Sequence, residues 1–98
     1  MNLNSEARGA LEKIIDDAIK GIPQQVSLFR RQSMKSELHL TKEEDFVLGM
    51  TWGSIMSIFI GRQMIQYQRL MMQNEKEEML AIILKRTREM RDAIFNVG

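Results

Sequence analysis

The feature that most constrains this chain is a run of sixteen residues without a charged side chain, from Phe46 to Gly61. Small residues recur at every fourth position within it, at Gly49, Gly53, Ser57 and Gly61. On a helix these residues form a small-residue strip, against which a second backbone can approach closely. Because a four-residue spacing drifts slowly around a helix of about 3.6 residues per turn, the strip favours a crossing contact over a long parallel seam.

Glycine is unfavourable inside a helix, at a cost of about 1 kcal/mol relative to alanine. The three glycines of the small-residue strip therefore call for a compensating contact. Either the strip packs against a second copy of the chain, or it accommodates a bulky residue of the chain's own first helix. The bulky residues of the run point in several directions, so the helix is expected to be buried on all sides.

A helix that is apolar on all sides is also typical of bilayers, which makes a membrane span the alternative. The uncharged run is shorter than the roughly 20 residues that cross the hydrocarbon core, and Arg62 and Gln63 end it. Met64 and Ile65 extend its apolar character, however. The alternative is therefore a small accessory subunit of a membrane complex, with a short single span at about 46–65 and a cytoplasmic C-terminal arm.

The N-terminal part predicts a short amphipathic helix over about 5–20. Asn4 or Ser5 can act as its N-cap. Its apolar residues recur at three- and four-residue spacing, at Ala7, Leu11, Ile14, Ile15, Ala18 and Ile22. Gly21 and Pro23 are expected to end the helix near Lys20, because glycine favours a left-handed cap and proline restricts the residue before it. A connector over about 21–40, more helical than extended, should follow.

The remainder predicts a long helical arm over about 42–96. Thr41 and Glu44 have the spacing of a capping box, and no proline follows them. The arm is either one helix or two helices broken near Gln73 and Asn74. We favour continuity, because this segment holds good helix formers and no glycine. The predicted fold is all-α and spans the whole chain as one domain. Its helical bundle is completed by oligomerisation, because a chain of 98 residues without cysteine buries only a small core.

The C-terminal part of the arm carries a heptad stripe with spacings of three and four, at Leu80, Ile83, Thr87, Met90, Ile94 and Val97. Thr87 is its one polar member. An ordinary amphipathic helix fits the pattern nearly as well as a coiled coil. The predicted helix-packing interface combines the small-residue strip with further residues, namely Trp52, Leu80, Ile83, Met90 and Ile94.

A basic cluster in the arm is the candidate anion contact, and it consists of Lys85, Arg86, Arg88 and Arg91. The whole chain is nearly neutral, with a formal net charge of +1 from 14 basic and 13 acidic residues. No aromatic residue interleaves with the cluster, as stacking on single-stranded nucleic acid would require. We therefore expect a solvated helix face, and nucleic acid is not an expected partner.

No pattern predicts catalysis, a cofactor or a metal site. The chain has no cysteine, and its one histidine, His39, leaves too few nitrogen ligands for an ordinary zinc site. Neither a glycine-rich phosphate loop nor a nucleophile elbow is present. These observations argue against an enzyme.

The function predicted is that of a non-enzymatic helical interaction protein, a self-associating scaffold or adaptor. Its expected partners are one or three further copies of itself, as a dimer or tetramer, and other protein subunits. A basic helical nucleic-acid-binding protein is the second alternative, after the membrane subunit. The N-terminus opens without the apolar segment of a secretory signal, so the expected compartment is the cytoplasm, with the membrane as its alternative.

Overall fold

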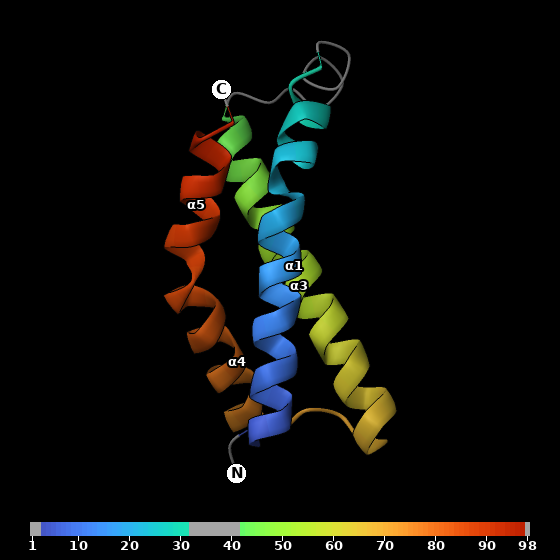
Figure 1. Cartoon of the computed structure of the whole chain (residues 1–98). Helices are drawn as coiled ribbons and strands as arrows, with labels where there is room; N and C mark the ends of the chain where they lie inside the picture. The colour runs from blue at the N-terminus through green and yellow to red at the C-terminus, as the bar shows by residue number, and fades with distance from the viewer. Residues whose placement is uncertain (1–2, 32–41, 98) are drawn as a thin grey trace.

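The computed structural model describes residues 3–31 and 42–97, and all regular secondary structure in these ranges is helical (Figure 1). The helices in chain order are α1 (Ser5–Phe29), α3 (Glu43–Tyr67), α4 (Gln73–Lys85) and α5 (Thr87–Phe95). The helix α3 runs back alongside α1, and α4 with α5 returns in the direction of α1 as a bent arm. The all-α fold class is confirmed, whereas completion of the bundle by oligomerisation stays a prediction.

The helix α1 begins where the sequence predicts and continues past both predicted stop signals. The Asn4 side chain is its N-cap and accepts a hydrogen bond of 2.8 Å from the Ala7 amide. The predicted end near Lys20 is wrong, because the helix extends to Phe29 with Pro23 inside it. No described glycine has a positive φ, so Gly21 is an ordinary helical residue and not a left-handed cap.

The burial of apolar side chains before and after Pro23 explains why the helix continues through it. A proline in a helix interior removes one backbone hydrogen bond and costs about 3 kcal/mol. Around it, Ile22, Val26 and Phe29 have exposed fractions of only 0%, 1% and 8%. Burying each such side chain contributes about 1.5–3 kcal/mol, so their combined burial outweighs the cost of the proline.

The arm is not continuous, so the favoured single helix over 42–96 is wrong. The helix α3 begins after Lys42, which makes no side-chain cap, and the predicted cap Thr41 lies outside the described residues. The chain leaves α3 at Gln68, which adopts the left-handed conformation with φ 53° and ψ 36°. Helix α4 then begins at Gln73, so the break lies a few residues before the predicted position near Gln73 and Asn74. A second break follows at Arg86, between α4 and α5.

A buried carboxylate holds the turn between α3 and α4. The Arg69 guanidinium donates to both oxygens of Glu75 over 2.8 and 3.0 Å, and the Met72 amide donates to the same carboxylate over 2.8 Å. Only 6% of Glu75 is exposed. The hydrogen bonds from Arg69, followed by the bond from the Met72 amide, lower the pKa of Glu75 from 4.5 to about 2. Glu75 therefore stays ionised and holds the first turn of α4 against the preceding loop.

The opposite end of the bundle is held by Arg30, which follows α1. Its guanidinium donates to the Glu43 carboxylate at the start of α3 over 2.7 Å and to the Val97 carbonyl after α5 over 2.8 Å. The Arg30 side chain thus joins the end of α1 to the start of α3 and to the end of the bent arm formed by α4 and α5. Such charge-assisted bonds are about twice as strong as neutral ones.

The core lies between α1, α3 and the arm. Its largest fully buried side chains come from all of these elements and include Leu11, Ile15, Ile55, Phe59, Met79, Ile83, Met90 and Ile94. Among the described residues no helix is long and apolar enough to cross a membrane, and this includes the helix at about 46–65.

Replacing Pro23 with alanine should stabilise the fold. The proline side chain is exposed, so its loss removes no core packing, whereas alanine restores a helical hydrogen bond. We expect the free energy of unfolding in urea to rise by about 1–3 kcal/mol. The exposed neighbour Gln24 is the control, and Gln24→Ala should change it by less than about 0.5 kcal/mol. A loss of stability in Pro23→Ala would mean that the bundle requires the proline at this position.

Stability should depend on pH through Glu75. Because its folded pKa is lowered from 4.5 to about 2, its contribution is present above pH 4.5 and is lost as the pH falls toward 2. At about pH 7, Glu75→Gln should cost about 1–2 kcal/mol in urea unfolding. The difference between the two proteins should shrink steadily below pH 4.5. A difference that does not change with pH would show that the carboxylate charge is not what holds the turn.

Candidate functional site

The side of α3 that faces the bundle carries a buried row at every fourth position, namely Val47, Thr51, Ile55, Phe59 and Gln63. The small-residue strip is offset from this row by two residues, which places it on the opposite side of the helix. Gly49, Gly53 and Ser57 are exposed there, and Gly61 is partly exposed. The strip therefore lies on the surface of the chain.

Within residues 3–31 and 42–97, no atom lies close to where a side chain would begin on the glycines of the strip. A Cβ atom placed on Gly49, Gly53 or Gly61 would meet no atom within 4 Å. The prediction that the strip accommodates a bulky residue of the first helix is therefore wrong. Each glycine weakens α3 by about 1 kcal/mol relative to alanine, and no contact within the described residues compensates for it.

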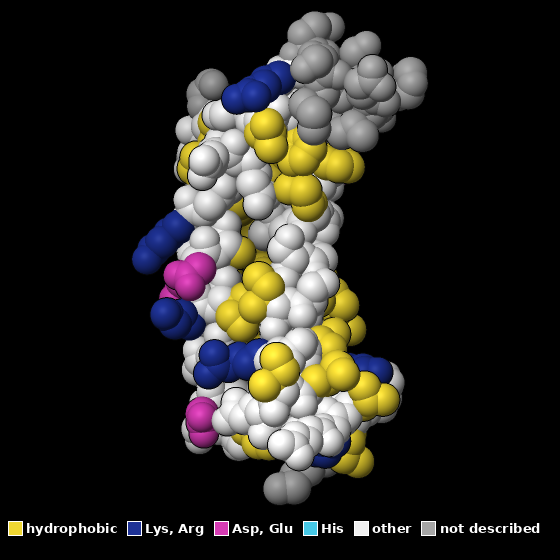
Figure 2. All heavy atoms as spheres, turned by 90° about the vertical axis from the view of Figure 1, so that its right-hand side faces the viewer, with side chains coloured by type: hydrophobic (Ala, Val, Ile, Leu, Met, Phe, Trp, Pro, Cys, Tyr) yellow, Lys and Arg dark blue, Asp and Glu magenta, His cyan; other side chains and the backbone are white. Residues whose placement is uncertain are grey.

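A flanking row of mostly larger residues runs beside the strip on α3, and it consists of Phe46, Met50, Ser54, Ile58 and Arg62. We call the strip and this flanking row together the outer face of α3. Ile58 is 57% exposed and Phe46 is 37% exposed. Between the two rows lies a shallow depression, lined by Met50, Gly53, Ser54, Ser57 and Ile58. Figure 2 views the molecule from the right-hand side of Figure 1 and shows hydrophobic side chains from the upper part of this face to the lower part.

Charges occur only at the two ends of the outer face. Asp45 lies at the N-terminal end in an acidic first turn, and Arg62 lies at the C-terminal end. Both are exposed, and neither forms an ion pair with another described residue. The outer face is thus uncharged in its middle, acidic at one end and basic at the other.

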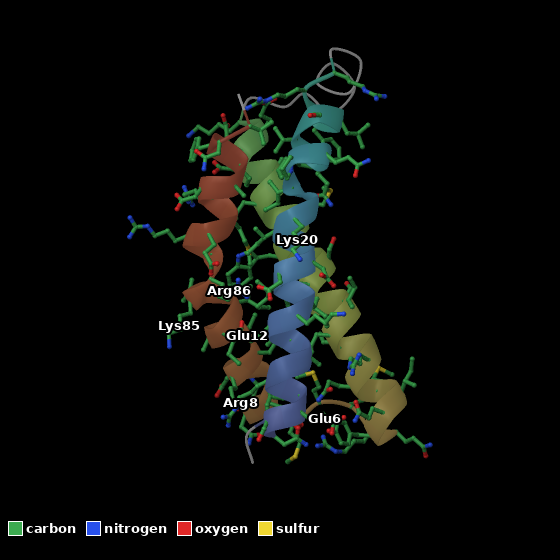
Figure 3. The ribbon with its side chains drawn as sticks, in the orientation of Figure 1. Glu6, Arg8, Glu12, Lys20, Lys85 and Arg86 are labelled. Atoms are coloured by element: carbon green, nitrogen blue, oxygen red, sulfur yellow. The ribbon has the colours of Figure 1, made fainter. Side chains whose placement is uncertain are left out.

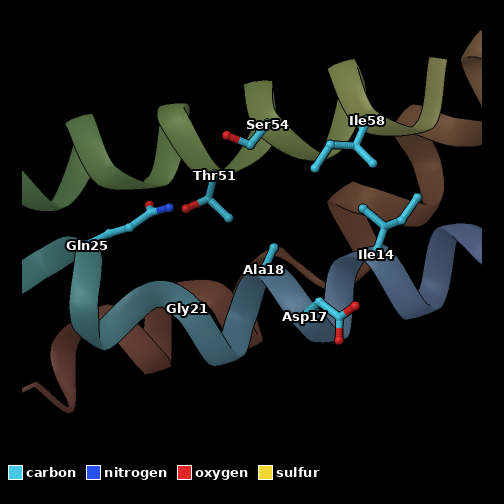
Figure 4. Close-up of a pocket in the computed structure, with 8 residues that line it drawn as sticks. All are labelled: Ile14, Asp17, Ala18, Gly21, Gln25, Thr51, Ser54 and Ile58. Carbon is cyan, nitrogen blue, oxygen red and sulfur yellow. The ribbon is translucent and has the colours of Figure 1, made fainter. Parts of the chain in front are cut away.

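A cavity of about 380 Å³ lies between α1 and α3 and adjoins the outer face at Ser54 and Ile58 (Figure 4). Most of its lining is apolar or small. At one end Gln25 extends toward Thr51, whose hydroxyl already donates to the Val47 carbonyl over 2.8 Å. At the other end Asp17 points away from α3. The cavity thus extends the mostly uncharged surface of α3 onto α1, with Asp17 as the one charged residue among the described residues that line it.

The other residues of the predicted interface lie in different surroundings. Ile83, Met90 and Ile94 are buried in the chain's own core, whereas Leu80 is 38% exposed. Trp52 is half-buried, and its indole N–H donates to the Thr87 hydroxyl over 2.9 Å. That hydroxyl donates in turn to the Ile83 carbonyl, over 2.9 Å. The polar member of the heptad stripe therefore joins α3 to the bent arm.

The basic cluster is divided between an internal ion-pair network and solvent. Arg86 points toward α1, where it contacts Asp16 over 2.7 Å and Glu12 over 3.2 Å, and it also contacts Glu89 over 2.7 Å (Figure 3). These partners raise the pKa of Arg86, mainly through Glu89, and Arg86 lowers the pKa of Glu89. The solvent-exposed members are Lys85, Arg88 and Arg91.

The described residues provide little for chemistry. No group of three or more histidine, cysteine or acidic side chains within these ranges could hold a metal ion. His39 lies outside the described residues. Glu12, Asp16 and Glu89 come together around the Arg86 guanidinium, which neutralises part of their charge.

Sequence reasoning missed the flanking row and the charges at its ends. The apolar residues of α3 surround the helix, so their pattern did not indicate which side faces the bundle. One signal was available, because Asp45 and Arg62 bound the uncharged run. Sequence reasoning also missed the internal role of Arg86, because its partners Glu12 and Asp16 are far away in the sequence.

Comparison of the chain with models of protein families, with curated proteins and with solved structures found no match.

Arg86 should contribute to stability and its neighbour Lys85 should not. Arg86→Met removes contacts with three acidic side chains while it keeps the aliphatic stem, so we expect a loss of about 1–2 kcal/mol in urea unfolding. Lys85 is adjacent, exposed and without a described ion pair, and Lys85→Met should change stability by less than about 0.5 kcal/mol. Equal effects of the two substitutions would contradict a structural role for Arg86.

Proposed function

We propose that this chain is a non-catalytic helical scaffold whose copies self-associate through the outer face of α3. The observation that supports this proposal is the exposure of the small-residue strip. Its glycines face away from the chain's own core and leave open space where side chains would otherwise stand. A second backbone is the partner for which such a surface is suited.

The energetics of α3 support the same proposal. Three helical glycines together weaken the helix by about 3 kcal/mol relative to alanine. Beside them on the outer face, Ile58 is 57% exposed and Phe46 is 37% exposed. Association would remove this apolar surface from water, at about 25 cal/mol per Å². Close packing over the glycines would add dispersion contacts that the single chain lacks.

The arm supports the adaptor part of the proposal. Its outer side carries the exposed cations Lys85, Arg88 and Arg91 beside Leu84 and Phe95, which are 65% and 60% exposed. The arm contacts α3 through Trp52, which lies outside the outer face, and the C-terminal end of α3 diverges from α4 in Figure 1. Association through α3 would therefore leave this side of the arm free for a different protein, with an acidic surface as the complementary chemistry.

The test is to replace Gly53 with leucine. In the single chain a Cβ atom at this position meets no atom within 4 Å, and leucine is a better helix former, so the fold should gain up to about 1 kcal/mol. In the assembly the same side chain would stand where the backbones approach each other. Light scattering over a range of concentrations should therefore give an oligomeric mass for the original chain and the mass of one chain for Gly53→Leu.

Gly9 provides a matched control. It is an exposed glycine within α1, and a Cβ atom there also meets no atom within 4 Å. Gly9→Leu should gain the same helical stability and keep the oligomeric mass. A single-chain mass for the original protein at every concentration would overturn the proposal, and so would an unchanged oligomeric mass in Gly53→Leu.

A further inference from the structure

We propose that two copies of the outer face of α3 pair antiparallel, around a two-fold axis that passes beside Gly53 and Ser54. This inference rests on the proposed self-association and specifies it, because it gives the direction of the partner and the residues that meet. Three features of the outer face lead to the same axis, namely its terminal charges, the sizes of its side chains and the position of its small residues.

The charges at its ends set the direction. In a two-fold dimer, a contact between one residue and a second residue of the partner occurs twice, with the roles exchanged. A parallel pair of α3 helices would bring Asp45 against Asp45 and Arg62 against Arg62, which is repulsive at both ends. An antiparallel pair brings Asp45 against Arg62 twice, and like-charge contacts are avoided.

The midpoint between these charges coincides with the most open part of the face. Residues 45 and 62 are centred between residues 53 and 54. Gly53 lies in the small-residue strip, Ser54 lies in the flanking row, and both are exposed. The closest approach of two crossing helices therefore falls where the side chains are smallest, as close packing requires.

Side-chain sizes match in the same register. When the helix is reversed about this midpoint, the residues of the flanking row other than Arg62 each lie opposite one residue of the strip. The pairs are Phe46 with Gly61, Met50 with Ser57, Ser54 with Gly53, and Ile58 with Gly49. The exposed Ile58 thus faces Gly49, and Phe46, whose ring also packs edge-on against Phe29 of its own chain at 5.0 Å between centroids, faces Gly61. Each glycine supplies the space that the large side chain fills, in the manner of a knob and a hole.

The register also allows the terminal ion pairs. Asp45 and Arg62 each lie about 13 Å along the helix from the axis, at 1.5 Å per residue. At a crossing angle of about 20°, two helices diverge by only about 4–5 Å over that distance, which an arginine side chain can span. A crossing angle near 50° would separate them by about 11 Å and lose the pairs. The inference therefore implies a shallow crossing.

Cysteine cross-linking tests the direction cleanly, because the chain has no cysteine of its own. Met50→Cys and Ser57→Cys are prepared as separate proteins, one of them isotopically labelled, then mixed and oxidised. Antiparallel pairing predicts disulfides between the two proteins, because positions 50 and 57 face each other. Two copies of position 57 would stand about 10 Å apart along the helices and should link poorly. Mass spectrometry distinguishes mixed from identical pairs.

Charge reversal tests the pairing of the ends. Asp45→Arg and Arg62→Asp should each weaken self-association by about tenfold or more, because each places like charges together at two positions. The double substitution should restore association to within about threefold of the original chain. Lys76→Glu, an exposed charge on α4 away from the outer face, is the control and should leave the dissociation constant unchanged.

The outcomes separate this inference from the function on which it rests. Mixed Met50–Ser57 disulfides together with rescue by the double charge reversal would support antiparallel pairing. Disulfides between identical positions, or no rescue in a chain that still self-associates, would overturn the direction and leave the scaffold proposal standing. A chain that shows a single-chain mass at every concentration would overturn both.

Discussion

The packing of α1 against the buried row of α3 is the contact on which the rest of this structure depends. The helix α3 is apolar around much of its circumference, and only one side of it can face the bundle. Val47, Ile55 and Phe59 are on that side and have exposed fractions of 0%. Their four-residue spacing matches the apolar stripe of α1, which continues through Ile22 and Val26 because their burial outweighs the cost of Pro23. Once this side is buried, the small-residue strip is left on the surface.

Three arginines place the ends and the middle of the bundle. Arg69 binds Glu75 at the turn between α3 and α4, Arg30 joins the far ends of the three rods, and Arg86 joins the bend of the arm to α1. Arg69 and Arg30 are held by charge-assisted bonds to partly buried groups, which carry more energy than freely exposed ion pairs, whereas the three acids around Arg86 are about half exposed. The hydrophobic core therefore supplies most of the stabilisation of the bundle, and the arginines determine where its helices begin, bend and end.

The outer face of α3 presents a self-complementary pattern. A small core without disulfides leaves a chain of this size marginally stable alone, and association is one common way to stabilise it. Here the surface available for association is also costly to leave exposed, since it combines helical glycines with exposed isoleucine and partly exposed phenylalanine. Acidic and basic ends give this face a direction, which a uniformly apolar face would lack.

Local sequence patterns were sufficient for the helical class, the cap at Asn4 and the strip of small residues, because helix periodicity and capping involve residues within one or two turns. They were insufficient wherever burial decided the outcome. Gly21 and Pro23 are strong local stop signals, but burial in the core keeps α1 helical beyond them. The segment after Tyr67 lacks such signals, but the left-handed Gln68 and the buried Glu75 interrupt the helix there. Sequence also placed Arg86 in a solvated cluster, whereas acids from α1 draw it inward. The sequence alone determined that the run from Phe46 to Gly61 is uncharged, carries glycines and is bounded by opposite charges. Only the tertiary structure decided which side of α3 is covered, because that choice depends on the stripe that α1 presents to it.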